Sequence, residues 1–252
     1  MSAASNDRVV LVTGAAQGLG EYLVRAFHAA GYRVGISDID ASRAAALAAS
    51  LDADGETTLG LGLDVRSQSE FEAARDALMA RWGRIDVLVN NAVVTKAQPV
   101  LEIAPDEFDA VLGVNMRGTF VGCQVMGRHF RDIGGGGRIV NIASLAGQNG
   151  GTATGAHYAA SKGGIITLTK VFARDLARFG VTVNAIAPGP LDLPSVRALV
   201  PADKLEGIVA GIPVGHLGSP AYVAATAVHL AGADAGFANG ATWDLNGGLL
   251  MR

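Results

Sequence analysis

The sequence has one cysteine, Cys123, so it cannot form a disulfide within a single chain. It also lacks a group of cysteines and histidines at the spacing of a zinc site, and we expect no bound metal. Charge is sparse: 17% of the 252 residues are charged, and the formal net charge is −3. A weakly negative chain does not provide the positive field that nucleic-acid binding requires.

Long hydrophobic runs are absent as well. No apolar run approaches the ~18 residues of a membrane span, and residues 1–8 have no apolar segment typical of a secretory signal. We therefore expect a cytoplasmic protein that does not bind membranes. Hydrophobic residues nevertheless make up 50% of the chain, and 34 residues are glycine. This composition predicts a full core, with tight turns or a close approach of the backbone to a ligand.

Short apolar segments alternate with helical segments along the chain. The predicted strands cover residues 8–13, 32–37, 59–63, 85–89, 138–142, 181–186 and 241–245. The predicted helices cover residues 18–30, 41–51, 67–82, 105–130, 157–179 and 220–231, the fourth either continuous or broken near Gly113 or Gly118. This order indicates an α/β fold, a Rossmann-type doubly wound sheet of about seven parallel strands with helices on both faces. No linker divides the chain, so we expect one domain over residues 1–252.

A glycine-rich turn follows the first predicted strand. It has the sequence Thr13-Gly14-Ala15-Ala16-Gln17-Gly18-Leu19-Gly20. At a strand-to-helix junction such glycines permit a tight turn, and the helix N-terminus favours a pyrophosphate. We predict that this turn binds a dinucleotide through Gly14, Gln17, Gly18, Leu19 and Gly20. A glycine turn without a ligand is the alternative.

Three further strand ends carry residues suited to the same ligand. Asp38 lies 18 residues after Gly20, where a carboxylate accepts hydrogen bonds from the adenosine ribose and repels a 2′-phosphate. With no cation in the glycine turn, and Arg43 expected on the next helix, this pattern favours NAD over NADP. Asp64 and Val65 are suited to the adenine ring, although Asp64 is alternatively a helix N-cap. Asn91 and Ala92, in the run Asn90-Asn91-Ala92, let the chain pass close to the cofactor.

Tyr158 and Lys162 are four residues apart, which places both on one face of the predicted helix. A tyrosine has an unperturbed pKa near 10. A lysine ammonium about 4 Å away is expected to lower the pKa of Tyr158 to about 7, so that its phenol exchanges a proton at neutral pH. Ser144, just past the strand 138–142, is suited to hold a substrate oxygen. Asn115 either points to solvent or, at a kink, holds a water that relays protons from Lys162.

In this order the motifs resemble those of the short-chain dehydrogenase/reductase family, over essentially the whole chain. The resemblance rests on the glycine turn, Asp38, Asn90-Asn91-Ala92, Asn115, Ser144, Tyr158-x3-Lys162 and Pro188-Gly189. It implies a catalytic tetrad of Asn115, Ser144, Tyr158 and Lys162, and hydride transfer between C4 of a nicotinamide and a carbinol carbon. It also implies that Tyr158, Lys162, Pro188, Gly189 and Leu191 contact the cofactor. A homotetramer is expected, packed through Val121, Cys123, Val125, Phe172 and Ala173.

Several positions depart from the family pattern. Val93 replaces a common glycine, Leu193 replaces a threonine that bonds the carboxamide (Ser195 being its candidate substitute), and Asn246 replaces an aspartate. The interval between Ser144 and Tyr158 is one residue longer than usual.

The resemblance places a substrate lid at about residues 190–212. Its side chains are mostly apolar, namely Leu191, Leu193, Pro194, Val196, Leu199 and Val200. They predict a modest-sized secondary alcohol or ketone as the substrate, such as an aromatic or alicyclic one. Arg197 is an anion candidate or part of a solvated helix face, and His157 and His216 are expected to be structural.

The favoured function is therefore NAD-dependent interconversion of a secondary alcohol and its ketone. One alternative is an NADPH-dependent enzyme resembling 3-oxoacyl-carrier-protein reductase, against which Asp38 counts. Another is a catalytically retired dinucleotide-binding module, against which the intact tetrad counts.

Overall fold

The computed structural model describes residues 7–151, 154–199 and 202–252, and within them seven strands form one sheet. The strands are β1 (Val9–Thr13), β2 (Arg33–Asp38), β3 (Thr58–Gly62), β4 (Val87–Asn90), β5 (Arg138–Ile142), β6 (Thr182–Pro188) and β7 (Thr242–Leu245). Their order is β3-β2-β1-β4-β5-β6-β7, and every pairing is parallel. The predicted Rossmann-type sheet is confirmed.

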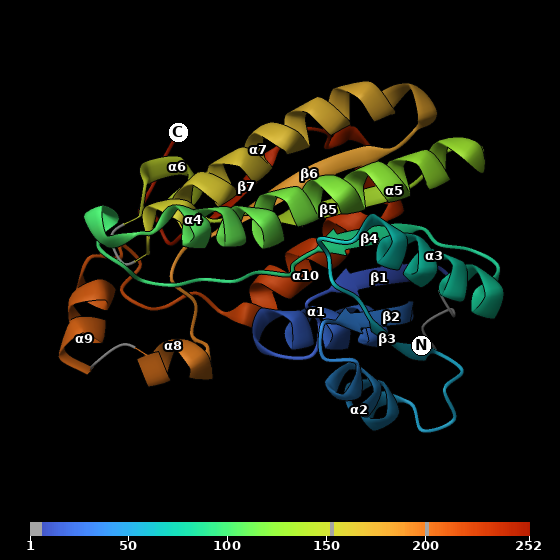
Figure 1. The fold of residues 1–252 in the computed structure, drawn as a ribbon, viewed down its shortest axis with the longest axis horizontal. Coiled ribbons are helices and arrows are strands. Elements are labelled where there is room, and N and C mark those ends of the chain that lie inside the picture. The colour runs from blue at the N-terminus through green and yellow to red at the C-terminus, as the bar shows by residue number, and fades with distance from the viewer. Residues whose placement is uncertain (1–6, 152–153, 200–201) are drawn as a thin grey trace.

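Helices cover both faces of this sheet (Figure 1). One face carries α1 (Gly18–Ala29), α2 (Ala41–Leu51) and α10 (Pro220–Ala231). The other carries α3 (Gln68–Trp82), α5 (Gly118–Asp132) and α7 (Ala156–Leu176), and α4 (Pro105–Leu112) packs against α7. Three shorter helices were not predicted: α6 (Ala146–Asn149), α8 (Pro194–Leu199) and α9 (Ala202–Ala210). In Figure 1 α8 and α9 stand away from the sheet, in the predicted lid.

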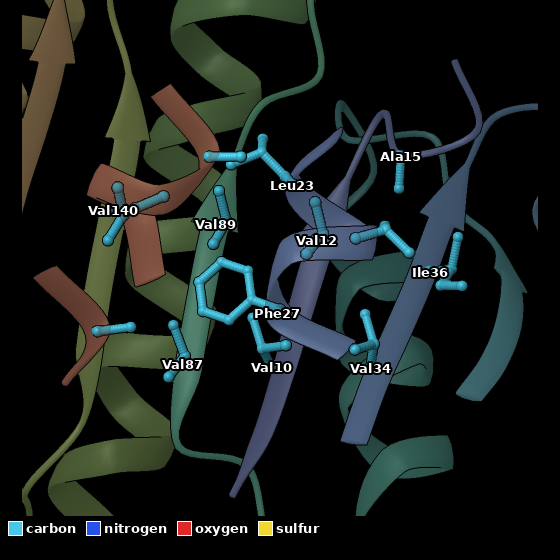
Figure 2. Close-up of a cluster of buried hydrophobic side chains, with 14 of the residues drawn as sticks. Val10, Val12, Ala15, Leu23, Phe27, Val34, Ile36, Val87, Val89 and Val140 are labelled. Carbon is cyan, nitrogen blue, oxygen red and sulfur yellow. The ribbon is translucent and has the colours of Figure 1, made fainter. Parts of the chain in front are cut away.

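The sheet is buried on both faces, which explains why its strands are continuous apolar runs. On one face Phe27 of α1 packs against valines of the central strands, including Val10 and Val89 (Figure 2). On the opposite face a second cluster contains Phe71 and Phe130, from α3 and α5. No helix in the described residues is long and apolar enough to cross a membrane.

The second cluster corrects one prediction about assembly. The residues Val121, Cys123, Val125 and Ala173, expected to face another subunit, are buried inside this chain. They point inward because α5 and α7 pack directly on the sheet. On the outer side the ring of Phe120 packs at a tilt against that of Phe172, with 5.8 Å between the ring centres. The exposed apolar side chains on these helices are instead Phe120 and Val171, each 39% exposed.

The predicted helix over residues 105–130 is interrupted. A π-helical segment, Gly113–Arg117, separates α4 from α5, and the Gly118 N–H donates to the Gly113 carbonyl. The interruption therefore begins at Gly113 and ends just before Gly118, the two glycines near which a break was predicted. Segments of this kind inside helices often occur at functional sites.

Candidate active site

The glycine turn lies where β1 meets β4, the point at which the strand order reverses and open α/β sheets bind ligands. Gly14 and Gly18 both have φ of +57°, which favours glycine. A Cβ at Gly20 would overlap the Gly14 carbonyl, whereas a Cβ at Gly18 would meet no atom within 4 Å. Gln17, the N-cap of α1, makes no side-chain cap bond, and Leu19 packs against the core. The backbone here is thus open to a ligand, which fits a dinucleotide pyrophosphate.

Asp38 ends β2 beside this turn and is only 8% exposed. Its Oδ2 accepts from the Ala16 N–H at 3.1 Å, and its Oδ1 accepts from the Asp40 N–H at 3.1 Å. The carboxylate is therefore fixed where the ribose acid was predicted. Arg43 reaches the same turn, because its Nη1 donates to Gln17 Oε1 at 3.1 Å. The sequence did not predict this contact, since it depends on how α2 packs.

Thr13 and Asn91 join the glycine turn to the end of β4. Asn91 Nδ2 donates to the carbonyls of Thr13 and Gly14, at 2.9 and 2.8 Å. Thr13 Oγ1 accepts from the N–H groups of Asn91 and Ala92, at 3.0 and 3.1 Å. Asn91 therefore holds the turn in shape. The sequence missed the role of Thr13, which resembles any β-branched strand residue.

Asp64 lies two residues beyond β3, and its carboxylate is bound by Arg66. The Arg66 Nη2 is 2.6 Å from Oδ2, and Nε lies 3.0 Å from both carboxylate oxygens. This hydrogen bonding holds the pKa of Asp64 below its usual value. The N-cap of the next helix, α3, is Ser67, so the alternative that Asp64 is a helix N-cap is wrong. The amino group of a bound adenine would therefore share the Asp64 carboxylate with the Arg66 guanidinium. The neighbouring Val65 is buried.

Ser144, Tyr158 and Lys162 come together at the carboxyl end of β5. Lys162 Nζ is 5.7 Å from the centre of the Tyr158 ring, so both residues do share one face of α7. The same Nζ donates to the carbonyl of Ile142, the last residue of β5, at 2.6 Å. Ser144 Oγ accepts from the Ala146 N–H at 3.1 Å, and the Ser144 side chain lies near enough to the Tyr158 phenol to lower its pKa. The side-chain cluster fits a proton-transfer site.

Burial controls the ionisation of this cluster. It raises the pKa of Tyr158, an effect that the Ser144 side chain partly opposes. Burial also lowers the pKa of Lys162 from 10.5 to about 7. The net shift of the Tyr158 pKa is therefore upward, opposite to the direction predicted from the neighbouring Lys162. The sequence spacing carries no information on desolvation, which disfavours the charged form of both groups.

Asn115 is fully buried within the π-helical segment. Its Oδ1 accepts from the Val94 N–H at 2.8 Å, and its Nδ2 donates to the Val94 carbonyl and to Ser161 Oγ, both at 3.0 Å. The side chain does not point to solvent, which was one of the two alternatives. It links the segment after β4 to α7, and a relay water at Asn115 stays a prediction.

The remaining cofactor candidates lie at the same edge of the sheet. The Leu145 N–H donates to the Pro188 carbonyl at 2.9 Å, and the Gly189 N–H donates to the Leu245 carbonyl at 2.9 Å. These bonds place the end of β6 between β7 and the segment carrying Ser144. Leu191 is buried against the core.

Arg197, predicted as an anion candidate or as part of a solvated helix face, lies exposed on α8 in the lid. Arg197 binds the Asp192 carboxylate through two bonds, of 2.6 and 3.0 Å. The anion candidate is thus already paired. Val200 lies outside the described residues, and so do the side chains of Ser195 and Leu199.

A chain of buried amides beneath the site was not predicted. Asn90 Nδ2 donates to Asn141 Oδ1 at 2.8 Å, and Asn141 Nδ2 donates to Thr169 Oγ1 at 2.9 Å. It connects β4, β5 and α7. The signal that could have revealed it is Asn141 itself, a polar residue in the apolar strand 138–142.

Comparison with known proteins agrees with this geometry. A family model described as short chain dehydrogenase matches residues 8–204. The chain is 36% identical to D-threitol dehydrogenase of Mycolicibacterium smegmatis, covering 98% of this chain and 94% of that protein. It is 39% identical to acetoacetyl-CoA reductase of Shinella zoogloeoides, covering 96% of this chain and 98% of that protein. The crystal structure of sorbitol-6-phosphate 2-dehydrogenase from Erwinia amylovora matches with a TM-score of 0.91 and 30% identity, covering 96% of this chain and 100% of that chain.

The chain belongs to the short-chain dehydrogenase/reductase family. It is an oxidoreductase of the kind that binds a nicotinamide dinucleotide.

Proposed function

We propose that this protein is an NAD-dependent dehydrogenase that interconverts a secondary alcohol and its ketone. The observation that carries the proposal is the meeting of Ser144, Tyr158 and Lys162 at the end of β5, beside a glycine turn flanked by Asp38. NAD, when bound, supplies the hydride acceptor of the reaction. The residues proposed to hold it are Gly14, Gln17, Gly18, Leu19, Gly20, Asp38, Asp64, Val65, Asn91, Ala92, Tyr158, Lys162, Pro188, Gly189 and Leu191.

The proposed proton transfer runs through Tyr158. Its phenolate takes the proton of the substrate hydroxyl during oxidation, and the resulting phenol returns that proton during reduction. The Ser144 hydroxyl holds the substrate oxygen beside the phenol. A protonated Lys162 favours the phenolate by its charge, and the two groups then titrate as a coupled pair. Asn115 keeps the segment after β4 in place.

Sugar alcohols, oxidised at a secondary hydroxyl, are the first substrate class to test. The names of two similar proteins, D-threitol dehydrogenase and sorbitol-6-phosphate 2-dehydrogenase, support this class. In the lid the guanidinium of Arg197 is paired with Asp192, so it is not free for a substrate phosphate. We therefore favour an uncharged polyol or another modest-sized secondary alcohol.

The second candidate is NADPH-dependent reduction of a 3-oxoacyl thioester. The similar acetoacetyl-CoA reductase favours it, and so does Arg43, which brings a cation to the glycine turn. Asp38 counts against it, because a carboxylate at the ribose repels a 2′-phosphate. A retired module is disfavoured by the assembled cluster around Tyr158.

One set of assays distinguishes these functions. Threitol, sorbitol and simpler secondary alcohols are offered with NAD+ or NADP+, and formation of the reduced cofactor is followed by absorbance. Acetoacetyl-CoA is offered in the reverse direction with NADH or NADPH. The proposal expects the highest kcat/KM for an alcohol with NAD+. A highest value for the thioester with NADPH would establish the second candidate.

We also propose that residues 1–252 act as one domain, with residues 190–212 as the lid, in a cytoplasmic homotetramer. The exposed Phe120 and Val171 support a subunit contact along α5 and α7.

A further inference from the structure

His157 directly precedes Tyr158 and is fully buried at the start of α7. From the sequence its ring was expected to be structural, and turned away from the face that carries the phenol. In the structure its Nδ1 accepts a hydrogen bond from the backbone N–H of Tyr158 at 2.8 Å. Its Nε2 lies 3.3 Å from Oε1 of Glu107 on α4.

These two contacts define the tautomer of the neutral ring. Because Nδ1 accepts a hydrogen bond it carries no hydrogen, so the ring proton of neutral His157 is on Nε2 and is donated to Glu107. The Lys96 ammonium is 3.1 Å from the other Glu107 oxygen. Hydrogen bonds from Lys96, and then from His157, hold the pKa of Glu107 below its usual value. Glu107 and Lys96 are the charged groups that the described contacts place against this ring.

The ring performs the task of a helix cap. The N-cap residue of α7 is Gly155, which has no side chain to accept a first-turn N–H. A larger residue does not fit there, because an added Cβ would overlap the His157 ring. The N–H of Tyr158, three positions into α7, is one of the donors without a partner inside the helix. His157 Nδ1 therefore provides the acceptor that Gly155 lacks.

A second bond ties the same turn to the loop after β4. The Gly155 N–H donates to the Lys96 carbonyl at 3.2 Å, and the Lys96 side chain binds Glu107. The first turn of α7 is thus connected to α4 and to residues 94–96 around one buried imidazole. This turn carries the Tyr158 phenol between Ser144 and Lys162.

We propose that His157 is a positioning residue that fixes Tyr158 through its backbone N–H, with Glu107 holding the imidazole in the Nε2–H form. The inference rests on the proposed role of Tyr158 as the acid/base. An error of about 1 Å in the placement of a reacting group costs up to 10²-fold in rate. Loss of this bond is therefore expected to reduce kcat without changing the cofactor site at Asp38.

Two substitutions of nearly equal shape test the proposal. His157→Asn keeps an oxygen near the position of Nδ1, whereas His157→Leu replaces it with a methyl group. We expect His157→Leu to lower kcat by about 10-fold or more, with an unchanged dissociation constant for NAD+. His157→Asn is expected to keep kcat within about 3-fold of the wild type, because the acceptor for Tyr158 remains. Both variants lose the ring and its bond to Glu107, and His157→Leu should lose more thermal stability because it also leaves the Tyr158 N–H without an acceptor.

A second readout needs no turnover. Titration of tyrosinate absorbance, taken as the difference from Tyr158→Phe, gives the midpoint of the Tyr158 phenol. His157→Leu is expected to move this midpoint and His157→Asn to leave it in place. If the two variants share the same kcat and the same midpoint, His157 is only structural and the proposal is wrong. Full activity of Tyr158→Phe would instead contradict the proposed function, so the two failures differ.

Glu107→Ala tests the same arrangement if His157→Leu does not fold. Without Glu107 the imidazole is free to carry its proton on Nδ1, facing the N–H of Tyr158. We expect kcat to fall several-fold, while Asp106→Ala, at the exposed neighbouring position, keeps the wild-type value. Equal kcat for Glu107→Ala and Asp106→Ala would contradict the proposed role of Glu107 and His157.

Discussion

Asn115 and Val94 are joined by two hydrogen bonds, from the Val94 N–H to Asn115 Oδ1 at 2.8 Å and from Nδ2 to the Val94 carbonyl at 3.0 Å. The first residue belongs to the π-helical segment and the second to the chain leaving β4. Just after the π-helical segment, a Cβ at Gly118 would overlap the Val65 side chain, so α5 begins in close contact with the segment after β3. The pair therefore couples the helix break to the cofactor side of the site.

We predict that Asn115→Leu destabilises the protein. The substitution removes three hydrogen bonds, to the N–H and carbonyl of Val94 and to the Ser161 hydroxyl, and a typical hydrogen bond contributes about 0.5–1.5 kcal/mol. The free energy of unfolding, measured with urea, is expected to fall by about 2–4 kcal/mol. A change below about 0.5 kcal/mol would show that Val94 finds other partners.

The cofactor preference is expected to depend on Asp38. Wild-type kcat/KM should be higher with NAD+ than with NADP+. Asp38→Ser should lower the ratio of these two kcat/KM values by about 10-fold or more, since charged hydrogen bonds contribute about 1.5–3 kcal/mol. Arg43 is in place to bind a 2′-phosphate once the carboxylate is removed. Adding Arg43→Gln should therefore reverse much of the gain with NADP+, with Arg43→Gln alone as the control. A wild-type preference for NADP+ would contradict the role given to Asp38.

Lys162 should make stability depend on pH. Burial lowers its pKa to about 7 in the folded chain, while an unfolded lysine keeps its proton up to about pH 10.4. Between these values the unfolded state binds more protons, so the folded state gains about 1.4 kcal/mol per pH unit as the pH rises. The gain is absent below the folded pKa.

The Lys162→Met variant provides the comparison, because it has no group that titrates at this position. Urea unfolding without cofactor, at pH 7, 8 and 9, is expected to show the wild type gaining stability relative to the variant. A difference that stays constant with pH would mean that Lys162 remains charged when the protein is folded.

We predict a tetramer whose contacts include the outer side of α5 and α7. Light scattering at micromolar concentration should give about four times the mass of one chain, which is 25.7 kDa. Val171→Asp should reduce that mass, because it places a charge on an exposed apolar side chain. The control is Lys170→Asp at the neighbouring exposed position. It adds negative charge without changing an apolar side chain, so it shows whether charge alone reduces the mass. A wild-type mass of one chain would contradict the prediction.

Much of the fold could be predicted because the apolar periodicity is strong. The helices over residues 41–51 and 220–231 have the predicted bounds, and the four-residue spacing of Tyr158 and Lys162 places them on one face. What the sequence could not show depends on contacts between distant segments. The bond from Arg43 to Gln17 and the contact of His157 with Glu107 are of this kind.

The pKa shifts of Tyr158 and Lys162 could not be predicted from the sequence for the same reason. Spacing shows that Tyr158 and Lys162 can meet, but burial of both residues is set by the packing of α7 against β5. Similarly, the periodicity over residues 105–130 indicates a helix, whereas the inward turn of Asn115 depends on the π-helical segment.

The central claim is that Tyr158 transfers the proton, and Tyr158→Phe tests it most directly. The variant keeps the ring and its packing but lacks the hydroxyl beside Ser144. With the best alcohol from the substrate assays and NAD+, turnover is expected to fall by about 10²–10⁴-fold. The dissociation constant for NAD+ should barely change, because the hydroxyl faces the substrate. Turnover close to that of the wild type would contradict the mechanism, even if the fold and the cofactor assignment both hold.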